Sequence, residues 1–305
     1  MILCCGEALI DMVPNEDDAF VPLAGGSVFN TAIGLGRQGV SVGMLSGVSN
    51  DLFGTKLSQT LADSHVSTAH LITSDRPTTL AFVRLVDGQA RYAFYDENTA
   101  GRMISPKDMP HDLPDDIDAL FFGGISLAVE PCADAYLSLL ETHAPERLIM
   151  VDPNIRSNFI KDEMRYRARL ERILALADIL KISDEDLDWV DQSNESLDAK
   201  VAKILANGPT LVCLTLGSKG VRLLDQDGEI ARAVPPKTDV VDTVGAGDAF
   251  SAGFLTILAR AESLSKKNIG SLGQDVLQDA INFATRFAAD TVTRKGSDPA
   301  WRFEL

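Results

Sequence analysis

The residues most able to do chemistry lie in one Gly-rich turn, residues 242–248, with the sequence Asp-Thr-Val-Gly-Ala-Gly-Asp. An extended pattern at residues 238–241 precedes the turn, and an apolar helical pattern follows it. Free backbone N–H groups at a helix start bind anions, and the helix dipole adds to the attraction. Gly245 and Gly247 would let the backbone approach phosphate oxygens closely. The turn therefore predicts a phosphate site.

Asp248 ends this turn and suits a different task. A carboxylate beside a phosphate site repels the anion, but it can accept a proton from a hydroxyl that attacks the phosphate. A simple helix cap is the alternative, because Asp is favoured at that position. The order of strand, glycines, carboxylate and helix favours the base.

Short apolar runs alternate with helical stretches along most of the chain, and these elements must hold the turn. The strand-like runs are residues 2–8, 41–46, 119–123, 148–152, 179–182 and 210–216. The clearest helical patterns are residues 162–177, 196–206, 248–261 and 274–291. This alternation predicts an α/β fold with a mostly parallel sheet between layers of helices.

Two stretches break the alternation. Residues 78–86 and 89–95 are strand-like and flank Asp87-Gly88, a hairpin signal. Residues 12–23 are strand-like around a polar turn at residues 15–18. No Pro/Ser-rich linker separates these stretches from the rest, so we expect one domain over residues 1–305 with a small β-appendage packed against it.

The composition restricts the partners. A net charge of −16 and a pI near 4.6 argue against binding to nucleic acid or to an anionic membrane. No apolar run reaches membrane-spanning length, and the N-terminal run lacks the basic start of a signal peptide. The four cysteines have no metal-type spacing and are expected to be buried thiols. We therefore expect a cytoplasmic protein with small-molecule partners.

Two signatures make the chain resemble the ribokinase-like (PfkB) family of carbohydrate kinases. Residues 242–248 resemble one signature, and residues 25–30, Gly-Gly-Ser-Val-Phe-Asn, resemble the other, with further matches over nearly the whole chain. The resemblance implies a three-layer α/β/α domain with a small β-sheet lid formed by about residues 12–23 and 78–96. It also implies transfer of the γ-phosphate of ATP to a sugar hydroxyl. Asp248 would be the catalytic base, and the anion hole would be formed by Gly245, Ala246 and Gly247.

The resemblance implies three further sets of contacts. The sugar contacts would be Asp11, Gly25, Gly26, Asn30 and Arg156. The nucleotide contacts would be Lys181, Ser183, Thr215, Gly217, Gly220 and Thr285. A potassium ion would be held by Asp242 and by backbone oxygens of Val244, Thr291 and Gly296, although Ala300 removes one ligand that ribokinase has. Mg²⁺ is required in principle to neutralise the phosphates, but Ser183 and Asp186 replace the family's Asn-x-x-Glu pair, which leaves its ligands open.

The identity of the sugar rests on smaller features. Residues 6–11 and 77–83 look most like fructokinases. Asp96 stands where fructokinases and 2-keto-3-deoxygluconate kinases carry Arg, and a carboxylate there would disfavour an acidic sugar. The glutamate that ribokinase uses on ribose maps near Ser126. We therefore expect fructose, with 2-keto-3-deoxygluconate, ribose and inosine left open, together with the question of a homodimer.

Two other classes of function compete with this interpretation. Residues 34–39 satisfy the Gly-x-Gly-x-x-Gly pattern of dinucleotide-binding dehydrogenases, but a helix from about Ser27 precedes them and a strand follows, the reverse of the required order. Close helix packing, with Gly39 ending the helix, explains these glycines better. A non-catalytic sugar sensor would be expected to lose the base or the glycines of residues 242–248, and this chain keeps them.

Overall fold

The computed structural model describes residues 1–304 except 16, 18, 87 and 88. An eight-stranded sheet with the order β14-β13-β12-β11-β10-β9-β1-β4 forms its centre. The pairs from β4 to β12 are parallel, and β13 and β14 join antiparallel. The strands are β1 (Ile2–Cys5), β4 (Val42–Leu45), β9 (Ala119–Gly123), β10 (Leu148–Asp152), β11 (Ile179–Ser183), β12 (Leu211–Thr215), β13 (Val221–Asp225) and β14 (Gly228–Ala233).

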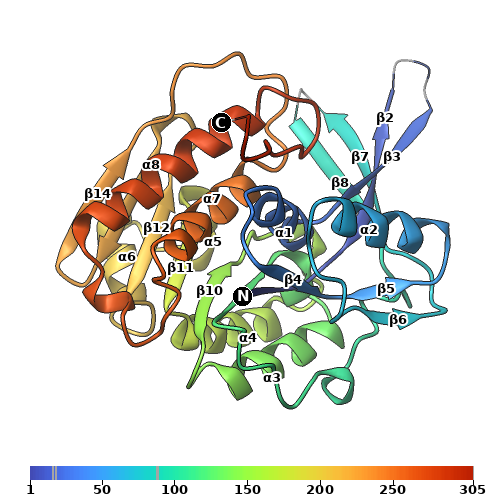
Figure 1. Cartoon of the computed structure of the whole chain (residues 1–305), viewed down its shortest axis with the longest axis horizontal. Helices are drawn as coiled ribbons and strands as arrows, with labels where there is room; N and C mark the ends of the chain where they lie inside the picture. The colour runs from blue at the N-terminus through green and yellow to red at the C-terminus, as the bar shows by residue number, and fades with distance from the viewer. Residues whose placement is uncertain (16, 18, 87–88, 305) are drawn as a thin grey trace.

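Helices cover both faces of this sheet (Figure 1). Along β1, Ile2 and Cys4 face one apolar cluster while Leu3 and Cys5 face the other, as the alternation of side chains in a strand requires. The first cluster includes side chains of α1 (Ser27–Arg37), α2 (Leu52–Asp63), α7 (Ala246–Arg260) and α8 (Gln274–Thr291). The second includes α3 (Cys132–His143), α4 (Glu163–Leu176), α5 (Asp184–Val190) and α6 (Leu197–Leu205). The three-layer α/β/α prediction is confirmed.

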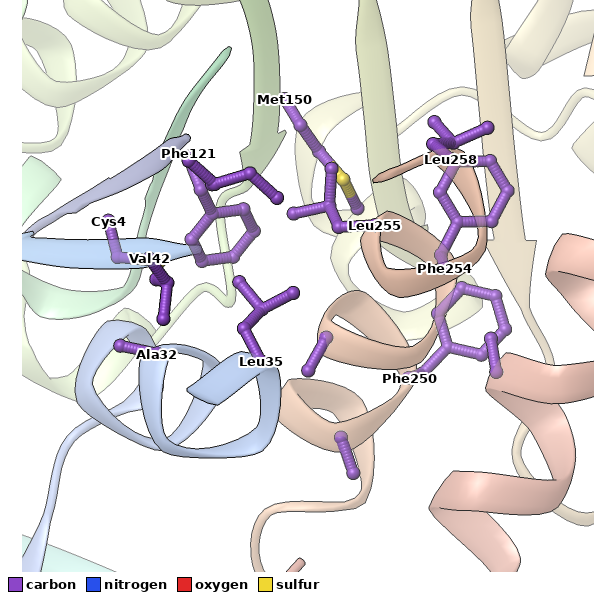
Figure 2. Packing of buried hydrophobic residues seen from close by; sticks show 14 of the residues in the cluster. Cys4, Ala32, Leu35, Val42, Phe121, Met150, Phe250, Phe254, Leu255 and Leu258 are labelled. Atoms are coloured by element: carbon purple, nitrogen blue, oxygen red, sulfur yellow. The ribbon is translucent and has the colours of Figure 1, made fainter. Parts of the chain in front are cut away.

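Helices α1 and α7 lie side by side on the sheet. Figure 2 shows Leu35 of α1 and Leu255 of α7 in one apolar layer with Phe121 of β9 and Met150 of β10. A Cβ on Gly34 would come within 2.8 Å of the Cβ of Ala252 in α7. Gly34 therefore serves close helix packing, as expected, and Gly39, with φ +76°, lies just after the end of α1. The packing of α1 on α7 places the start of α1 beside the start of α7.

A second, four-stranded sheet with the order β3-β2-β7-β8 stands at one end of the molecule, at the upper right of Figure 1. Its strands are β2 (Leu9–Pro14), β3 (Phe20–Gly25), β7 (Leu80–Val86) and β8 (Gln89–Tyr95). The predicted β-appendage is thus present, but it begins at Leu9 rather than residue 12. The predicted hairpin turn at Asp87-Gly88 lies outside the described residues, as do residues 16 and 18 of the other polar turn.

Several local predictions need correction. Strand β1 ends at Cys5 rather than at residue 8, because the chain leaves the large sheet to begin β2. The extended pattern of residues 238–241 forms no strand; its backbone is irregular.

The four cysteines are buried free thiols, as expected. None of the helices in the described part of the chain has both the length and the apolar character to span a membrane.

Candidate active site

A cavity of about 1270 Å³ lies between the small sheet and the carboxyl edge of the parallel strands. Ligands of open α/β sheets bind at this edge, because the loops that follow the strands converge there. Its volume exceeds the roughly 300–1000 Å³ typical of a site for one small ligand, so two substrates can enter. The predicted site residues that line it are Asp11, Gly26, Asn30, Arg156, Lys181, Val244, Gly245, Gly247 and Asp248.

The Gly-rich turn gives the cavity a helix N-terminus. Gly245 has φ +80° and immediately precedes α7, and a Cβ on it would lie 2.2 Å from the Ser297 hydroxyl oxygen. Because Gly245 adopts this left-handed conformation, α7 begins at Ala246, so Asp248 lies inside the first turn rather than at the predicted start. Among the described residues, the backbone N–H groups of Gly247 and Asp248 have no hydrogen-bond acceptor. They remain available for an anion.

The Asp248 carboxylate is held from two sides. The Ser27 hydroxyl donates to its Oδ1 at 2.7 Å, and the Asn30 amide nitrogen donates to its Oδ2 at 2.8 Å. Burial raises the pKa of Asp248 to about 6, against the lowering effect of the Asn30 and Ser27 hydrogen bonds. At neutral pH the group is therefore largely ionised, oriented and close enough to its pKa to take up a proton, as a general base must be.

A buried ion pair lies beside the helix start. Lys181 of β11 donates through Nζ to Asp152 Oδ2 at 2.9 Å, with 7% and 0% of the two side chains exposed. Burial opposes the charge on Lys181, but the hydrogen bond and charge of Asp152, with the charges of Asp186 and Asp248, together raise the lysine's pKa. A Cβ on Gly247 would lie only 2.8 Å from Nζ, so only glycine leaves room for both. The lysine therefore brings a positive charge to the predicted anion hole.

Glu7 and Asp11 are further carboxyl residues among those that line the cavity. Burial raises the pKa of Asp11 to about 7, with a contribution from the charge of Asp248. Burial likewise raises the pKa of Glu7 to about 7, although the backbone N–H groups of Ser27 and Ser126 donate to its two oxygens at 3.0 and 3.3 Å. Such carboxyl groups can accept hydrogen bonds from the hydroxyls of a polyol.

These carboxyl groups give the ligand-free protein an unusual pH dependence. Folding raises the pKa values of Glu7, Asp11 and Asp248, so the folded state binds more protons than the unfolded state between about pH 5.5 and 7.5. The resulting stability is present at low pH and lost as pH rises through the folded pKa values. We expect the free energy of unfolding in urea to be about 4 kcal/mol higher at pH 5.5 than at pH 7.5.

The matched variant for this experiment is Glu7→Gln, which should show a weaker pH dependence because it removes one titrating group. Carboxylates whose pKa is lowered, such as Glu229 at about 2, titrate below this window and do not interfere. A wild-type stability that falls on acidification from pH 7.5 to 5.5 would contradict the expectation.

Two charged residues of the cavity, Arg156 and Asp96, bear on the choice of sugar. Arg156 donates to the backbone oxygens of Asn154 and Ile155 at 3.4 and 3.2 Å and has no carboxylate partner among the described residues. Asp96, by contrast, is 4% exposed and accepts from Arg102 Nη1 through both oxygens, at 3.0 and 2.9 Å. The expectation that Asp96 repels an acidic sugar therefore loses its basis, because Arg102 compensates the charge.

The predicted nucleotide contacts other than Lys181 lie outside this cavity. Ser183 caps α5 by accepting from the Asp186 N–H at 3.0 Å, and the Thr215 hydroxyl donates to the Ile182 oxygen at 3.4 Å. Gly217 and Gly220 have positive φ angles, 56° and 98°, in the turn after β12. Thr285 lies on α8, and its buried hydroxyl has no partner among the described residues. Strand β11 pairs with β10 and β12 pairs with β11, both in parallel, so the residues that end these strands belong to the same edge of the sheet.

The predicted cation ligands are partly brought together. Asp242 accepts from the Val244 N–H at 3.0 Å and from the Gly296 N–H at 2.9 Å. Its own N–H donates to the oxygen of Val292, the residue after Thr291, at 3.2 Å. Asp242 therefore ties the turn before α7 to the segment after α8, through backbone N–H groups that donate to its carboxylate.

Four residues of this site were missed by sequence reasoning: Glu7, Ser27, Asp152 and Asn154. Three of them lie at the carboxyl ends of buried strands. Glu7 follows β1, Asp152 is the last residue of β10, and Asn154 follows β10. Polar side chains at the carboxyl ends of parallel strands are the signal that could have identified them. Ser27 carries no such signal, because only the packing of α1 against α7 brings it to Asp248.

Comparisons with known proteins agree with this geometry. The family model described as pfkB family carbohydrate kinase matches residues 1–302. The chain is 47% identical over 284 residues to a fructokinase of Rhizobium leguminosarum bv. trifolii, which is 92% of this chain and 86% of that protein. Its fold is similar to that of a Xylella fastidiosa fructokinase with bound ATP, with a TM-score of 0.88, 25% identity and coverage of 97% of this chain and 93% of the other.

A second solved structure shares the fold. It is a double mutant of the fructokinase of Vibrio cholerae O395 that contains fructose, ADP and a potassium ion, with a TM-score of 0.85, 24% identity and coverage of 97% and 93% of the two chains. The match of the family model over almost the whole length, together with the 47% identity, settles the relationship. The chain belongs to the pfkB family of carbohydrate kinases.

Proposed function

We propose that the protein is an ATP-dependent fructokinase. The observation that carries the proposal is the Asp248 carboxylate, buried and held by Ser27 and Asn30 in the first turn of α7, beside N–H groups that have no acceptor among the described residues. A base next to an anion site matches transfer of a phosphoryl group to a hydroxyl. The 47% identity to the Rhizobium fructokinase supports fructose as the acceptor.

In this mechanism the sugar binds between the small sheet and α1, with Asp11, the Gly25-Gly26 turn and Asn30 at its hydroxyls. A Cβ on Gly25 would lie 2.1 Å from Asp11 Oδ2, so glycine is what leaves room for that carboxylate. One sugar hydroxyl points to Asp248, which takes its proton as the oxygen attacks the γ-phosphorus of ATP. The bond between the γ-phosphorus and the bridging oxygen breaks, and ADP leaves. The N–H groups of Gly245 and Gly247, with Lys181 beside them, stabilise the charge on the transferred group. The Ala246 N–H, which donates to the Thr243 oxygen at 3.3 Å, would join them by exchanging this acceptor for a phosphate oxygen.

The small sheet has the position of a lid. Strands β2 and β8 place Asp11, Tyr92 and Phe94 on the cavity, so a rigid movement of this sheet would change access to the sugar site. We propose that the sheet closes over the sugar and keeps water from the γ-phosphate, which would otherwise be hydrolysed. The moving part of the domain would then be strands β2, β3, β7 and β8, within a single folded unit.

Two cations complete the proposed reaction. Asp242 and the backbone oxygens of Val244, Thr291 and Gly296 would hold a potassium ion, because hard cations prefer oxygen ligands. The hydrogen bonds from the Val244 and Gly296 N–H groups bring these two residues next to the carboxylate. Such an ion would help to fix the turn that carries the anion hole. Mg²⁺ would enter with ATP and neutralise its phosphates.

The test of this function is release of ADP from ATP in the presence of Mg²⁺ and K⁺, measured across fructose, 2-keto-3-deoxygluconate, ribose and inosine. We expect fructose to give the highest kcat/KM. The acidic sugar belongs in the panel because Arg102 neutralises Asp96 and Arg156 has no carboxylate partner in the described structure. Ribose is expected to be poor, because Ser126 offers no carboxylate and its hydroxyl donates to the Gly123 oxygen at 2.7 Å.

The outcomes of the panel separate the candidates. Faster turnover of 2-keto-3-deoxygluconate than of fructose would change the substrate and keep the reaction. Binding of sugar without release of ADP would favour the sensor. Repeating the fructose assay with Na⁺ in place of K⁺ tests the cation site, and an unchanged rate would argue against it.

A further inference from the structure

Ser27 connects the catalytic base to the rest of the site. Its hydroxyl donates to Asp248 Oδ1 at 2.7 Å and accepts from the side-chain nitrogen of Asn154 at 2.8 Å. A serine hydroxyl has a single proton. Because Asn154 occupies an acceptor position of the hydroxyl, the proton is directed to the carboxylate.

The backbone of Ser27 is fixed as well. Its N–H donates to Glu7 Oε1 at 3.0 Å, and Glu7 is itself buried. Gly124, with φ +67°, allows this arrangement, because a Cβ there would lie 2.0 Å from Glu7 Oε1. Ser27 is therefore held at its main chain from the end of β1 and at its side chain from the end of β10.

Asn154 is prepared for this contact by its own backbone. It has φ +44°, a left-handed conformation that Asn tolerates better than most residues. The conformation follows directly after Asp152 and Pro153 at the end of β10. The resemblance implied only a sugar contact of Arg156 for this segment, whereas its structure also directs Asn154 to Ser27 at the start of α1.

We infer that Ser27 is a positioning residue for the base: its hydroxyl, oriented by Asn154, holds the Asp248 carboxylate in the direction that proton transfer from the sugar needs. The inference rests on the proposed function and deepens it. Asn30, the other donor to Asp248, is also a proposed sugar contact and can exchange its hydrogen bond for one to the sugar. Ser27 differs from Asn30, because the other hydrogen bond of its hydroxyl is made with a protein side chain, that of Asn154.

The surroundings of Asp248 determine what the loss of Ser27 should do. The charged and titratable groups that face Asp248 are Asp11 from β2, Tyr92 from β8, Asp152 from β10 and Lys181 from β11. None of them changes in Ser27→Ala. The variant removes one donor that stabilises the ionised carboxylate, so the pKa of Asp248 should rise further.

The experiment compares the wild type with Ser27→Ala, Asn154→Ala and the double variant. In Ser27→Ala we expect kcat, measured at pH values above the acid limb of the profile, to fall about tenfold, because the carboxylate is less well oriented. The acid limb of kcat/KM for the sugar should move up by about one pH unit, because a hydrogen bond to a charged group is lost. Asn154→Ala should show the same changes more weakly, and the double variant should equal Ser27→Ala, since Asn154 acts through Ser27.

Thr31→Val is the matched control. The Thr31 hydroxyl lies one turn further along α1 and donates to the backbone oxygens of Ser27 and Asp248 at 3.1 and 3.4 Å, without contact to the carboxylate. Its loss can reduce stability but should leave the acid limb in place. The inference would be overturned if Ser27→Ala kept the wild-type kcat and the wild-type acid limb of kcat/KM. It would also be overturned if the losses in kcat of the two single variants multiplied in the double variant. A wild type that phosphorylates no sugar would instead overturn the proposed function.

Discussion

The Asp248→Asn variant is expected to bind sugar and ATP with near wild-type affinity and to lose at least about 1000-fold in kcat. The amide has the shape of the carboxylate and can still accept from Ser27 at its oxygen, but it cannot take up a proton at neutral pH. The hydroxyl that attacks the γ-phosphorus would have to lose its proton to water. Single-turnover measurements with bound ATP would separate this chemical step from binding and release.

A suitable control for Asp248→Asn is Asp178→Asn. Asp178 is another buried carboxylate, 7% exposed, which accepts from the Ile149 N–H at 2.8 Å and pairs with Lys266 outside the cavity. Its substitution should lower stability and leave kcat unchanged. If Asp248→Asn kept more than a tenth of the wild-type kcat, Asp248 would not be the base.

The fold could be predicted well where the sequence pattern has one physical cause. Residues 119–123 and 148–152 are apolar on both faces because helices cover both sides of the sheet, and their predicted bounds match β9 and β10. The bounds of α8 match the predicted residues 274–291 for a similar reason, since its apolar side chains recur at helical spacing. Strand β1 was predicted too long by three residues, because the chain leaves the sheet at Gly6 to bring Glu7 to the cavity and to begin β2.

The candidate site could be predicted only in part. Residues 242–248 carry their chemistry in local order, so a phosphate site and a nearby base follow from the sequence. The partners of Asp248 do not, because Ser27 reaches it across 221 positions of the chain. The same holds for Asp96, whose role changes once Arg102 is seen to neutralise it. Side-chain pairing in a buried site is a property of the tertiary structure.

The carboxyl groups of the cavity link function to stability. Burial raises the pKa values of Glu7, Asp11 and Asp248, so keeping them ionised at neutral pH costs folding free energy. Activity has the opposite pH dependence, because Asp248 can act as a base only when ionised. Acidification should thus stabilise the ligand-free protein while it inactivates the enzyme. Such opposition is expected where a site is organised for chemistry rather than for stability.

Replacing Lys181 with Met is expected to impair both properties. The variant removes a positive charge beside Gly247, and loss of one electrostatic contact to the transferred phosphoryl group should lower kcat about 100-fold. It also leaves Asp152 buried without its partner, which should lower the free energy of unfolding by about 3 kcal/mol. The two effects are measured by steady-state kinetics with fructose and by urea unfolding.

Two further variants distinguish the catalytic effect of Lys181 from the structural one. Asp152→Asn combined with Lys181→Met removes the unpaired charge, so stability should largely return while kcat stays low. Lys200→Met breaks another ion pair of a buried lysine, with Asp188 at 2.6 Å, but outside the cavity. Since Asp188 is 61% exposed and can be solvated, this control should lose less stability than Lys181→Met and keep its kcat. Recovery of kcat in the double variant would mean that Lys181 serves only to neutralise Asp152.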